Sequence, residues 1–151
     1  MIETKWVFRN KQDQDGIVVK NKARLVAQGC TQVKGLDFGE TYALAARLKA
    51  IRILLAYACA HNIKHYQMDV KSAFLNGYIN EEVYVGFEDN KKPDHVYKLK
   101  KALYGLKQAP RAWYERLRDF LLSKGFTMGK VDTTLFIKKI EKRYICVVNL
   151  C

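Results

Sequence analysis

One aspartate stands where a metal ion could be bound. Asp69 lies at the end of the short buried strand expected over Tyr66–Val70 and precedes the segment Lys71–Gly77. A carboxylate at the end of a buried strand is costly unless a group pairs with it, and Mg²⁺ prefers such hard oxygen ligands. A magnesium ligand is therefore one interpretation of the pattern. The alternative is that Asp69 caps the following turn with help from Ser72, which is a common role for a single acid.

The segment Leu103–Tyr114 combines a glycine turn with cations at an expected helix start. Gly105 permits a close backbone approach, and Lys107 and Arg111 carry positive charge. The N-terminus of a helix also favours anions. These features predict a surface for nucleic acid and an incoming triphosphate. An ordinary glycine turn leading into an amphipathic helix with a core of aromatic residues is the alternative.

Three cations alternate along the segment Lys20–Gly29. Lys20, Lys22 and Arg24 have the same parity, so on a strand their side chains line one face. Such a face binds phosphates in one interpretation and is simply a solvated strand face in the other.

The elements that would position these residues follow from periodicity and turn signals. A β-hairpin is expected over residues 5–28 with its turn at Asp13–Gly16. Helices are expected over residues 43–60 and 109–124, the second with Pro110 in its first turn. Further strands are expected at residues 66–70, 83–85, 96–99, 135–137 and 144–150, with turns at 89–94 and 141–143. The pattern predicts one α+β domain with an antiparallel sheet and two main helices.

The charge of the chain is unusual for a domain of this size. It has 27 Lys and Arg against 15 Asp and Glu, a net charge of +12. Such a surplus repels itself in the compact state and is typical of proteins that bind a polyanion, above all nucleic acid. A basic but merely solvated surface is the alternative.

Cysteine usage and apolar runs indicate a compartment. The four cysteines form no C-x-x-C pair, so neither a zinc site nor a disulfide framework is expected. Cys59 and Cys146 lie in apolar runs and are expected in the core. Lys5 and Arg9 interrupt any signal peptide, and no run is long enough for a membrane helix. An intracellular protein of the cytoplasm or nucleus, with no membrane partner, is predicted.

Three motifs in order carry a resemblance to a known family. They are K-A-R-L-V-A-Q-G at residues 22–29, Q-M-D-V-K-S-A-F-L-N-G at 67–77 and L-Y-G-L-K-Q-A-P-R-A-W-Y at 103–114. Together they resemble the reverse transcriptase of copia-type LTR retrotransposons of plants, over essentially the whole chain. The resemblance implies an RNA-directed DNA polymerase that adds dNTPs to a primer 3′-OH on an RNA or DNA template, using two Mg²⁺ ions.

The resemblance also implies a role for each matching residue. A partial right-hand polymerase is expected, with fingers first and then the N-terminal part of the palm. Asp69 matches the catalytic carboxylate that binds both metal ions, assisted by the backbone carbonyl of Val70. Phe74 matches the bulky residue that excludes a 2′-OH. The residues expected to bind the dNTP are Lys22, Arg24, Phe74, Tyr104 and Gly105. Those expected to bind template and primer are Lys107, Gln108, Pro110 and Arg111.

The family's second metal-binding element, a Tyr-x-Asp-Asp turn, is not found in these residues. The segment Ile145–Cys151 resembles the strand that leads into it. Residues 1–151 are therefore expected to be a single incomplete reverse transcriptase domain, without thumb, RNase H or integrase regions, and inactive alone. Two alternatives stay open, a non-catalytic basic nucleic-acid-binding module and a pseudogene product without function.

Overall fold

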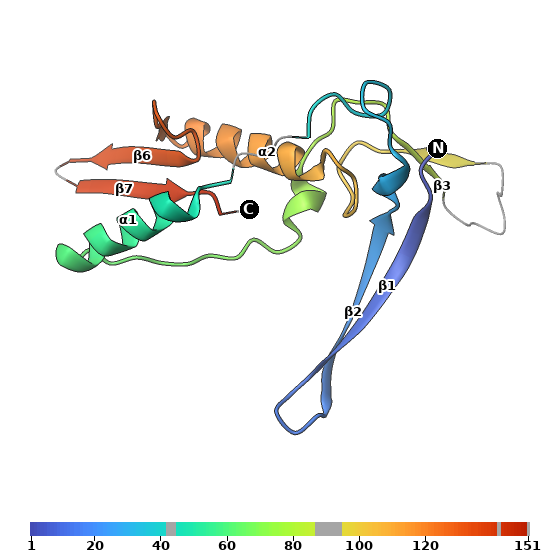
Figure 1. Cartoon of the computed structure of the whole chain (residues 1–151), viewed down its shortest axis with the longest axis horizontal. Helices are drawn as coiled ribbons and strands as arrows, with labels where there is room; N and C mark the ends of the chain where they lie inside the picture. The colour runs from blue at the N-terminus through green and yellow to red at the C-terminus, as the bar shows by residue number, and fades with distance from the viewer. Residues whose placement is uncertain (42–44, 87–94, 142, 151) are drawn as a thin grey trace.

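In the residues that the structure describes, two α-helices and three small antiparallel sheets are found (Figure 1). The computed structural model describes residues 1–41, 45–86, 95–141 and 143–150. The elements are β1 (Thr4–Gln12), β2 (Val18–Ala27), the 3-10 helix η1 (Gly29–Thr31), α1 (Leu48–Ala60), the 3-10 helix η2 (Ala73–Asn76), β3 (Tyr84–Gly86), β4 (Val96–Lys98), α2 (Ala109–Ser123), β5 (Thr127–Met128), β6 (Leu135–Ile140) and β7 (Arg143–Val148). The sheets are β1–β2, β3–β4 and β5–β6–β7. The α+β prediction with two main helices is confirmed, and the strands form three sheets instead of one.

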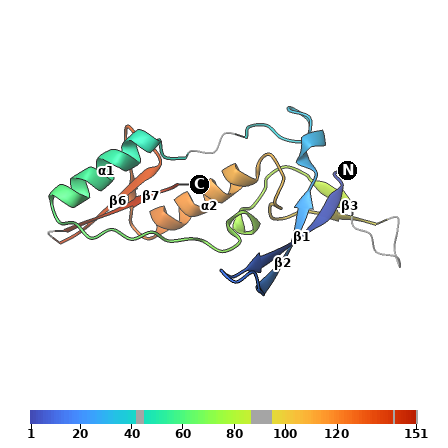
Figure 2. The ribbon, with the colours of Figure 1, turned by 60° about the horizontal axis from the view of Figure 1, so that its bottom comes forward.

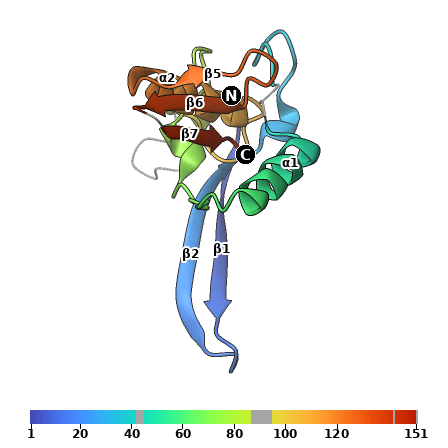
Figure 3. The same ribbon diagram turned by 90° about the vertical axis from the view of Figure 1, so that its left-hand side faces the viewer.

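β1 and β2 form a long hairpin that projects from the rest of the molecule (Figures 1 and 3). At its turn the Asp13 carboxylate accepts hydrogen bonds from the N–H groups of Asp15 and Ile17. Gly16 follows with a φ of +81°, a conformation that glycine adopts without strain. The turn is thus closed by its own residues, and the hairpin predicted over residues 5–28 is confirmed.

The root of the hairpin belongs to the first of two hydrophobic cores. Ile2 pairs with Val85 of β3, which fastens the N-terminus to that sheet. Apart from Ile2, the members come from β2, β3 and its approach, the loop before α2 and the first turn of α2. They are Ile2, Ala27, Val83, Val85, Ala102, Leu106, Ala109 and Ala112. This core joins the hairpin to the beginning of α2.

The second core lies between α2 and the β5–β6–β7 sheet. Its buried members are Tyr114, Leu121 and Phe136, and Phe136 is fully enclosed. α2 has Pro110 in its first turn, and Gly125, with a φ of +80°, follows its end, as expected. Because α2 contributes to both cores, it connects the two ends of the elongated molecule (Figure 2).

α1 is confirmed but begins at Leu48, later than the predicted residue 43. Its N-terminal approach is held by a hydrogen bond from the N–H of Ala46 to the carbonyl oxygen of Asn149. Several large apolar side chains of α1 remain exposed, Ile53 and Tyr57 among them. In the part of the chain that the structure describes, no helix has the length and apolar character to cross a membrane.

The strand predicted at residues 66–70 is wrong. This segment is extended but belongs to no sheet, and Tyr66 and Met68 are 79% and 80% exposed. A strand needs a neighbour for its N–H and C=O groups, and none of the described strands pairs with these residues. The other predicted strands correspond to β3, β4, β6 and β7, and the turn predicted at 89–94 lies outside the described residues.

The prediction that Cys59 and Cys146 are core residues is also wrong, because both are exposed. Cys146 pairs with Ile137 in the sheet, whereas the neighbouring pair, Phe136 and Val147, faces the second core. Since alternate residues of a strand point to opposite faces, Cys146 lies on the face turned away from α2.

Candidate functional site

Tyr104 is the central side chain of the candidate site. Its ring packs against Phe74 of η2, with ring centroids 5.3 Å apart. The guanidinium of Arg24, from β2, lies over the same ring with its Cζ 5.7 Å from the centroid. An aromatic contact and a cation–π contact therefore bring together three predicted dNTP-binding residues from segments far apart in the sequence.

Two glycines allow this assembly, because the backbones of two segments cross in contact. The N–H of Ala27 donates a 2.8 Å hydrogen bond to the carbonyl oxygen of Tyr104. Gly105 follows with a φ of +91°, and a Cβ atom there would lie 2.1 Å from the Ala27 oxygen. A Cβ atom on Gly29 would lie 2.1 Å from the Gly105 oxygen. Neither position accommodates a side chain without displacing the backbone.

A buried pair of glutamines locks the loop before α2 to the loop after β2. Gln32 Nε2 donates a 3.0 Å hydrogen bond to Gln108 Oε1, and Gln32 Oε1 accepts one of 2.9 Å from the N–H of Lys107. Lys107 Nζ donates a 3.0 Å hydrogen bond to the backbone carbonyl oxygen of Gln32. Buried amides are stable only when bonded in this way. Lys107 and Gln108, both predicted at the template, are thus held by internal hydrogen bonds.

Asp69 lies on the exposed segment between α1 and η2, and its charge acts on Lys22 of the hairpin. The pKa of Lys22 is lowered, mainly by the positive charge of Lys11. Partial desolvation and the charges of Arg24 and Lys20 lower it further, whereas the Asp69 carboxylate acts in the opposite direction. Asp69 is therefore within electrostatic reach of Lys22. The following helix η2 receives no side-chain cap, so the structure does not support the capping alternative for this acid.

The described residues do not complete a metal site around Asp69. No group of three or more His, Cys, Asp and Glu side chains in the described residues could hold an ion together. Two-metal catalysis needs shared ligands that keep both cations about 4 Å apart. A single exposed carboxylate, with Val70 on the same unpaired segment, does not meet that requirement.

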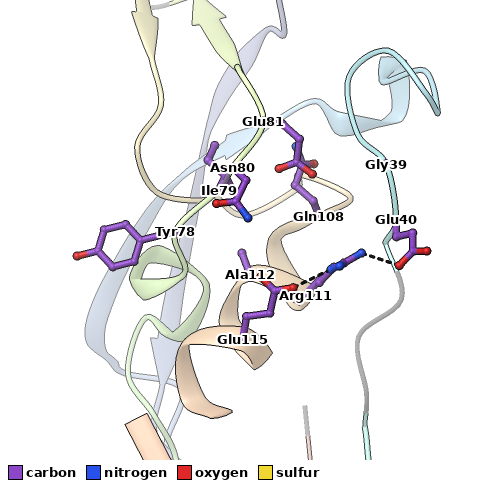
Figure 4. A pocket seen from close by; sticks show the side chains of 10 residues that line it. All are labelled: Gly39, Glu40, Tyr78, Ile79, Asn80, Glu81, Gln108, Arg111, Ala112 and Glu115. Atoms are coloured by element: carbon purple, nitrogen blue, oxygen red, sulfur yellow. Dashed lines mark hydrogen bonds and ion pairs between the residues drawn. The ribbon is translucent and has the colours of Figure 1, made fainter. Parts of the chain in front are cut away.

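Arg111 borders a polar hollow at the start of α2 (Figure 4). Its Nη1 is 2.7 Å from Glu40 Oε2, and its Nε is 3.0 Å from Glu115 Oε1. These bonds raise the pKa of Arg111, and the hydrogen bond with Glu115 has the larger effect. The hollow has a volume of about 320 Å³ and is also lined by Tyr78, Asn80 and Gln108. A phosphate of the template would have to compete with two carboxylates for Arg111.

The predicted residues fall into two neighbouring groups. The first consists of Arg24, Phe74, Tyr104 and Gly105, which meet near the root of the hairpin, with Lys22 farther along β2 and Asp69 within electrostatic reach of Lys22. The second lies where the loop before α2 enters the helix and consists of Lys107, Gln108, Pro110 and Arg111. Sequence reasoning missed Gln32 and Glu40, because a lone glutamine and a lone glutamate in a loop have no periodic signal. It also missed Gly77, where a Cβ atom would lie 2.6 Å from the backbone of Ala112.

Comparison with known proteins gives a single consistent result. The profile of the reverse transcriptase (RNA-dependent DNA polymerase) family matches residues 1–150. The chain is 45% identical over 149 residues to the retrovirus-related Pol polyprotein from transposon RE1 of Arabidopsis thaliana, covering 96% of this chain and 10% of that protein. The corresponding RE2 protein is 45% identical over 141 residues, covering 91% and 10%.

A more distant plant relative agrees. The retrovirus-related Pol polyprotein from transposon TNT 1-94 of Nicotiana tabacum is 39% identical over 153 residues, covering 99% of this chain and 12% of that protein. The chain thus spans about a tenth of the length of the curated relatives that it matches. No solved structure matches the chain.

Proposed function

The chain belongs to the reverse transcriptase (RNA-dependent DNA polymerase) family, and we propose that it is the fingers and the first part of the palm of a copia-like Pol polyprotein. The family binds a nucleic-acid template and dNTPs, and it uses Mg²⁺. The proposal assigns the same classes of ligand to this chain. The observation that supports it best is the contact of Arg24 with Tyr104 and of Tyr104 with Phe74, beside Lys22 and Asp69.

This arrangement suits a nucleoside triphosphate in three respects. Arg24 and Lys22 supply positive charge for the phosphates, and Arg24 is oriented by its contact with Tyr104. Phe74 and Tyr104 supply an apolar wall beside which the sugar would lie. Asp69 lies within electrostatic reach of Lys22, as a palm carboxylate beside the triphosphate would.

We further propose that these 151 residues alone do not catalyse polymerisation. They supply one candidate metal-binding carboxylate, whereas the two-metal mechanism needs ligands that bridge both ions. The test is primer extension by the purified chain with primer–template, dNTPs and either Mg²⁺ or Mn²⁺. No extension is expected. Extension that disappears in the Asp69→Asn variant would contradict the proposal.

A second function, non-catalytic binding of nucleic acid, is favoured by the hairpin. All six charged side chains of β1 and β2 are cations. We expect binding to primer–template duplexes that weakens steeply with salt, measured by fluorescence anisotropy. The binding constant falls with salt, and the double variant Lys22→Ala/Arg24→Ala should make this fall less steep. The slope of the log of the binding constant against log salt should become less negative by about 0.9 for each phosphate that is no longer neutralised. Lys49→Ala, on exposed α1, is the matched control and should change little. Binding that is indifferent to salt would contradict this function.

A further inference from the structure

Arg111 is held by two carboxylates that come from different segments of the chain. Its Nε donates a 3.0 Å hydrogen bond to Glu115 Oε1, and its Nη1 donates one of 2.7 Å to Glu40 Oε2. Glu115 lies four residues farther along α2, whereas Glu40 lies 71 residues earlier in the chain. The guanidinium therefore lies between the two acids and joins the segment of Glu40 to α2 (Figure 4).

The two acids differ in how firmly they are placed. Glu115 is on the same helix as Arg111, and an i,i+4 spacing keeps two side chains within reach whatever else binds. Its side chain is only 30% exposed. Glu40 belongs to no helix or strand of the described structure, and its side chain is 75% exposed. Glu40 is consequently the partner that can leave Arg111.

A phosphate group can bind Arg111 in the place of the Glu40 carboxylate. The planar guanidinium binds carboxylates and phosphates through the same N–H donors. An arginine has five such donors, and in the described structure two of those of Arg111 are bonded to the glutamates. The adjoining hollow of about 320 Å³ leaves room for a phosphate beside the guanidinium. An incoming phosphate can therefore bond to Arg111 before Glu40 leaves.

The exchange needs little free energy. Exposed ion pairs contribute at most about fivefold to an equilibrium constant, because water screens the charges and two long side chains must be ordered. The chain has a net charge of +12, so a polyanion gathers near its surface and gains from releasing counterions. The phosphates of such a polyanion compete well with one exposed carboxylate.

We propose that Glu40 is a positioning residue that occupies Arg111 in the unbound protein and gives way to a phosphate of the template. This inference rests on the proposed nucleic-acid binding and adds an internal competitor to it. Glu115 keeps the guanidinium at the hollow before and after the exchange, so only the second partner of Arg111 changes. Glu40 thus lowers the affinity for the template, and binding of the template releases the segment of Glu40 from α2.

The test measures binding of the full chain to a fluorescein-labelled primer–template duplex by anisotropy at several salt concentrations. Glu40→Gln removes the competing charge and should strengthen binding up to about fivefold. The salt dependence should stay the same, because the same phosphates are contacted in the complex. Arg111→Gln should weaken binding and make the slope of the log of the binding constant against log salt less negative by about 0.9.

The double variant Glu40→Gln/Arg111→Gln separates the contact from a general effect of charge. Without the guanidinium there is nothing for Glu40 to occupy, so Glu40→Gln should give no fivefold gain in this background. Glu81→Gln is the matched control, because Glu81 lines the same hollow but is drawn without a bond to Arg111 in Figure 4. It should strengthen binding much less than Glu40→Gln does. Circular dichroism checks that every variant is folded.

Four outcomes would overturn the role of Glu40 while nucleic-acid binding stands. The first is an unchanged affinity in Glu40→Gln, and the second is an equal gain in Glu81→Gln. The third is a gain from Glu40→Gln that persists in the Arg111→Gln background, since it would then come from charge alone. The fourth is an Arg111→Gln variant with the affinity and slope of the wild type, because no phosphate would then reach Arg111. If the wild type does not bind the duplex at low salt, this inference and the proposed binding both fail.

Discussion

At the scale of single residues, the candidate site depends on two glycines, Gly29 and Gly105, because glycine has no Cβ atom. The backbones around Gly29 and Gly105 approach so closely that the carbonyl oxygen of one segment occupies the place of a Cβ atom on the other. This contact carries the peptide of Tyr104 against Ala27. The positions of the Tyr104 and Arg24 side chains therefore follow from a backbone contact as much as from their own packing.

Replacing Gly105 should be far more costly than replacing a glycine in open space. Gly105→Ala places a methyl group against the Ala27 carbonyl and keeps a positive φ, so we expect a loss of roughly 3 kcal/mol or more. Gly16→Ala is the control, because Gly16 also has a positive φ but nothing lies near its missing Cβ. It should cost about 1 kcal/mol. Urea denaturation measures both, and equal losses would show that the backbone crossing is not tight.

Asp132 should give a stabilisation that depends on pH. Its carboxylate accepts hydrogen bonds from the hydroxyl and from the N–H of Thr134. Both bonds lower the pKa of Asp132, and the bond from the hydroxyl lowers it more. Because the pKa of Asp132 is lower in the folded state than in the unfolded state, where it is about 3.9, the ionised carboxylate stabilises the fold above that pH. This stabilisation is lost as the pH falls through the pKa of the folded state. Asp132→Asn should therefore cost about 1 kcal/mol at neutral pH.

The difference between wild type and Asp132→Asn should shrink as the pH falls below about 3.9. Urea midpoints at a series of pH values measure it. Asp15→Asn, in the hairpin turn, serves as the control and should not reproduce the trend. A difference that stays constant down to the lowest pH at which the chain folds would contradict the role assigned to this carboxylate.

At the scale of elements, local signals were sufficient where an element completes its own hydrogen bonds. The hairpin closes through its Asp13–Gly16 turn, and α2 begins with Pro110 and ends at Gly125. The strand predicted at residues 66–70 failed because a strand depends on a partner that periodicity does not reveal. The same limit applies to the candidate site. Motifs predicted Arg24, Phe74 and Tyr104, whereas the glutamine pair depends on a contact across loops far apart in the chain.

The segment 64–71 should be the least protected part of the described chain apart from the hairpin turn. No backbone N–H of these residues donates a hydrogen bond to another backbone group in the described structure. We expect its amides to exchange with D₂O at nearly the rate of an unfolded peptide, while the amides of Phe136 and Ile137 in β6, which lie between β5 and β7, are protected. Hydrogen exchange read by mass spectrometry or NMR measures this. Protection of segment 64–71 equal to that of β6 would mean that Asp69 lies on a paired strand in solution.

At the scale of the whole molecule, two small cores share one helix. Ala109 and Ala112 of α2 belong to the core at the hairpin root, and Tyr114 and Leu121 belong to the core under the β5–β6–β7 sheet. Many large apolar side chains lie outside both cores, including most of those on α1. Stability therefore rests on few buried groups, and damage to either core should be transmitted through α2 to the other.

Phe136→Ala should destabilise the entire chain and not only the sheet. Phe136 is fully buried between β6 and α2, and its truncation should cost roughly 3–5 kcal/mol. Phe120→Ala is the control, because Phe120 is half exposed on the same helix and should cost much less. Urea unfolding in a Trp6→Phe background, where Trp113 is the remaining tryptophan, followed by fluorescence and by circular dichroism, should give coincident transitions. Separate transitions for the two probes would show that the cores unfold independently.

The hairpin also has a mechanical consequence, since it is anchored only at one end. Ten residues of β2 at about 3.3 Å each make an arm of about 33 Å. The backbone crossing of Gly29 and Gly105 lies at the root of this arm. A tilt of about 5° there would swing the Asp13–Gly16 tip by about 3 Å over this length, while Arg24 near the root would hardly move. Any displacement at the root is therefore amplified along the hairpin and is largest at its turn.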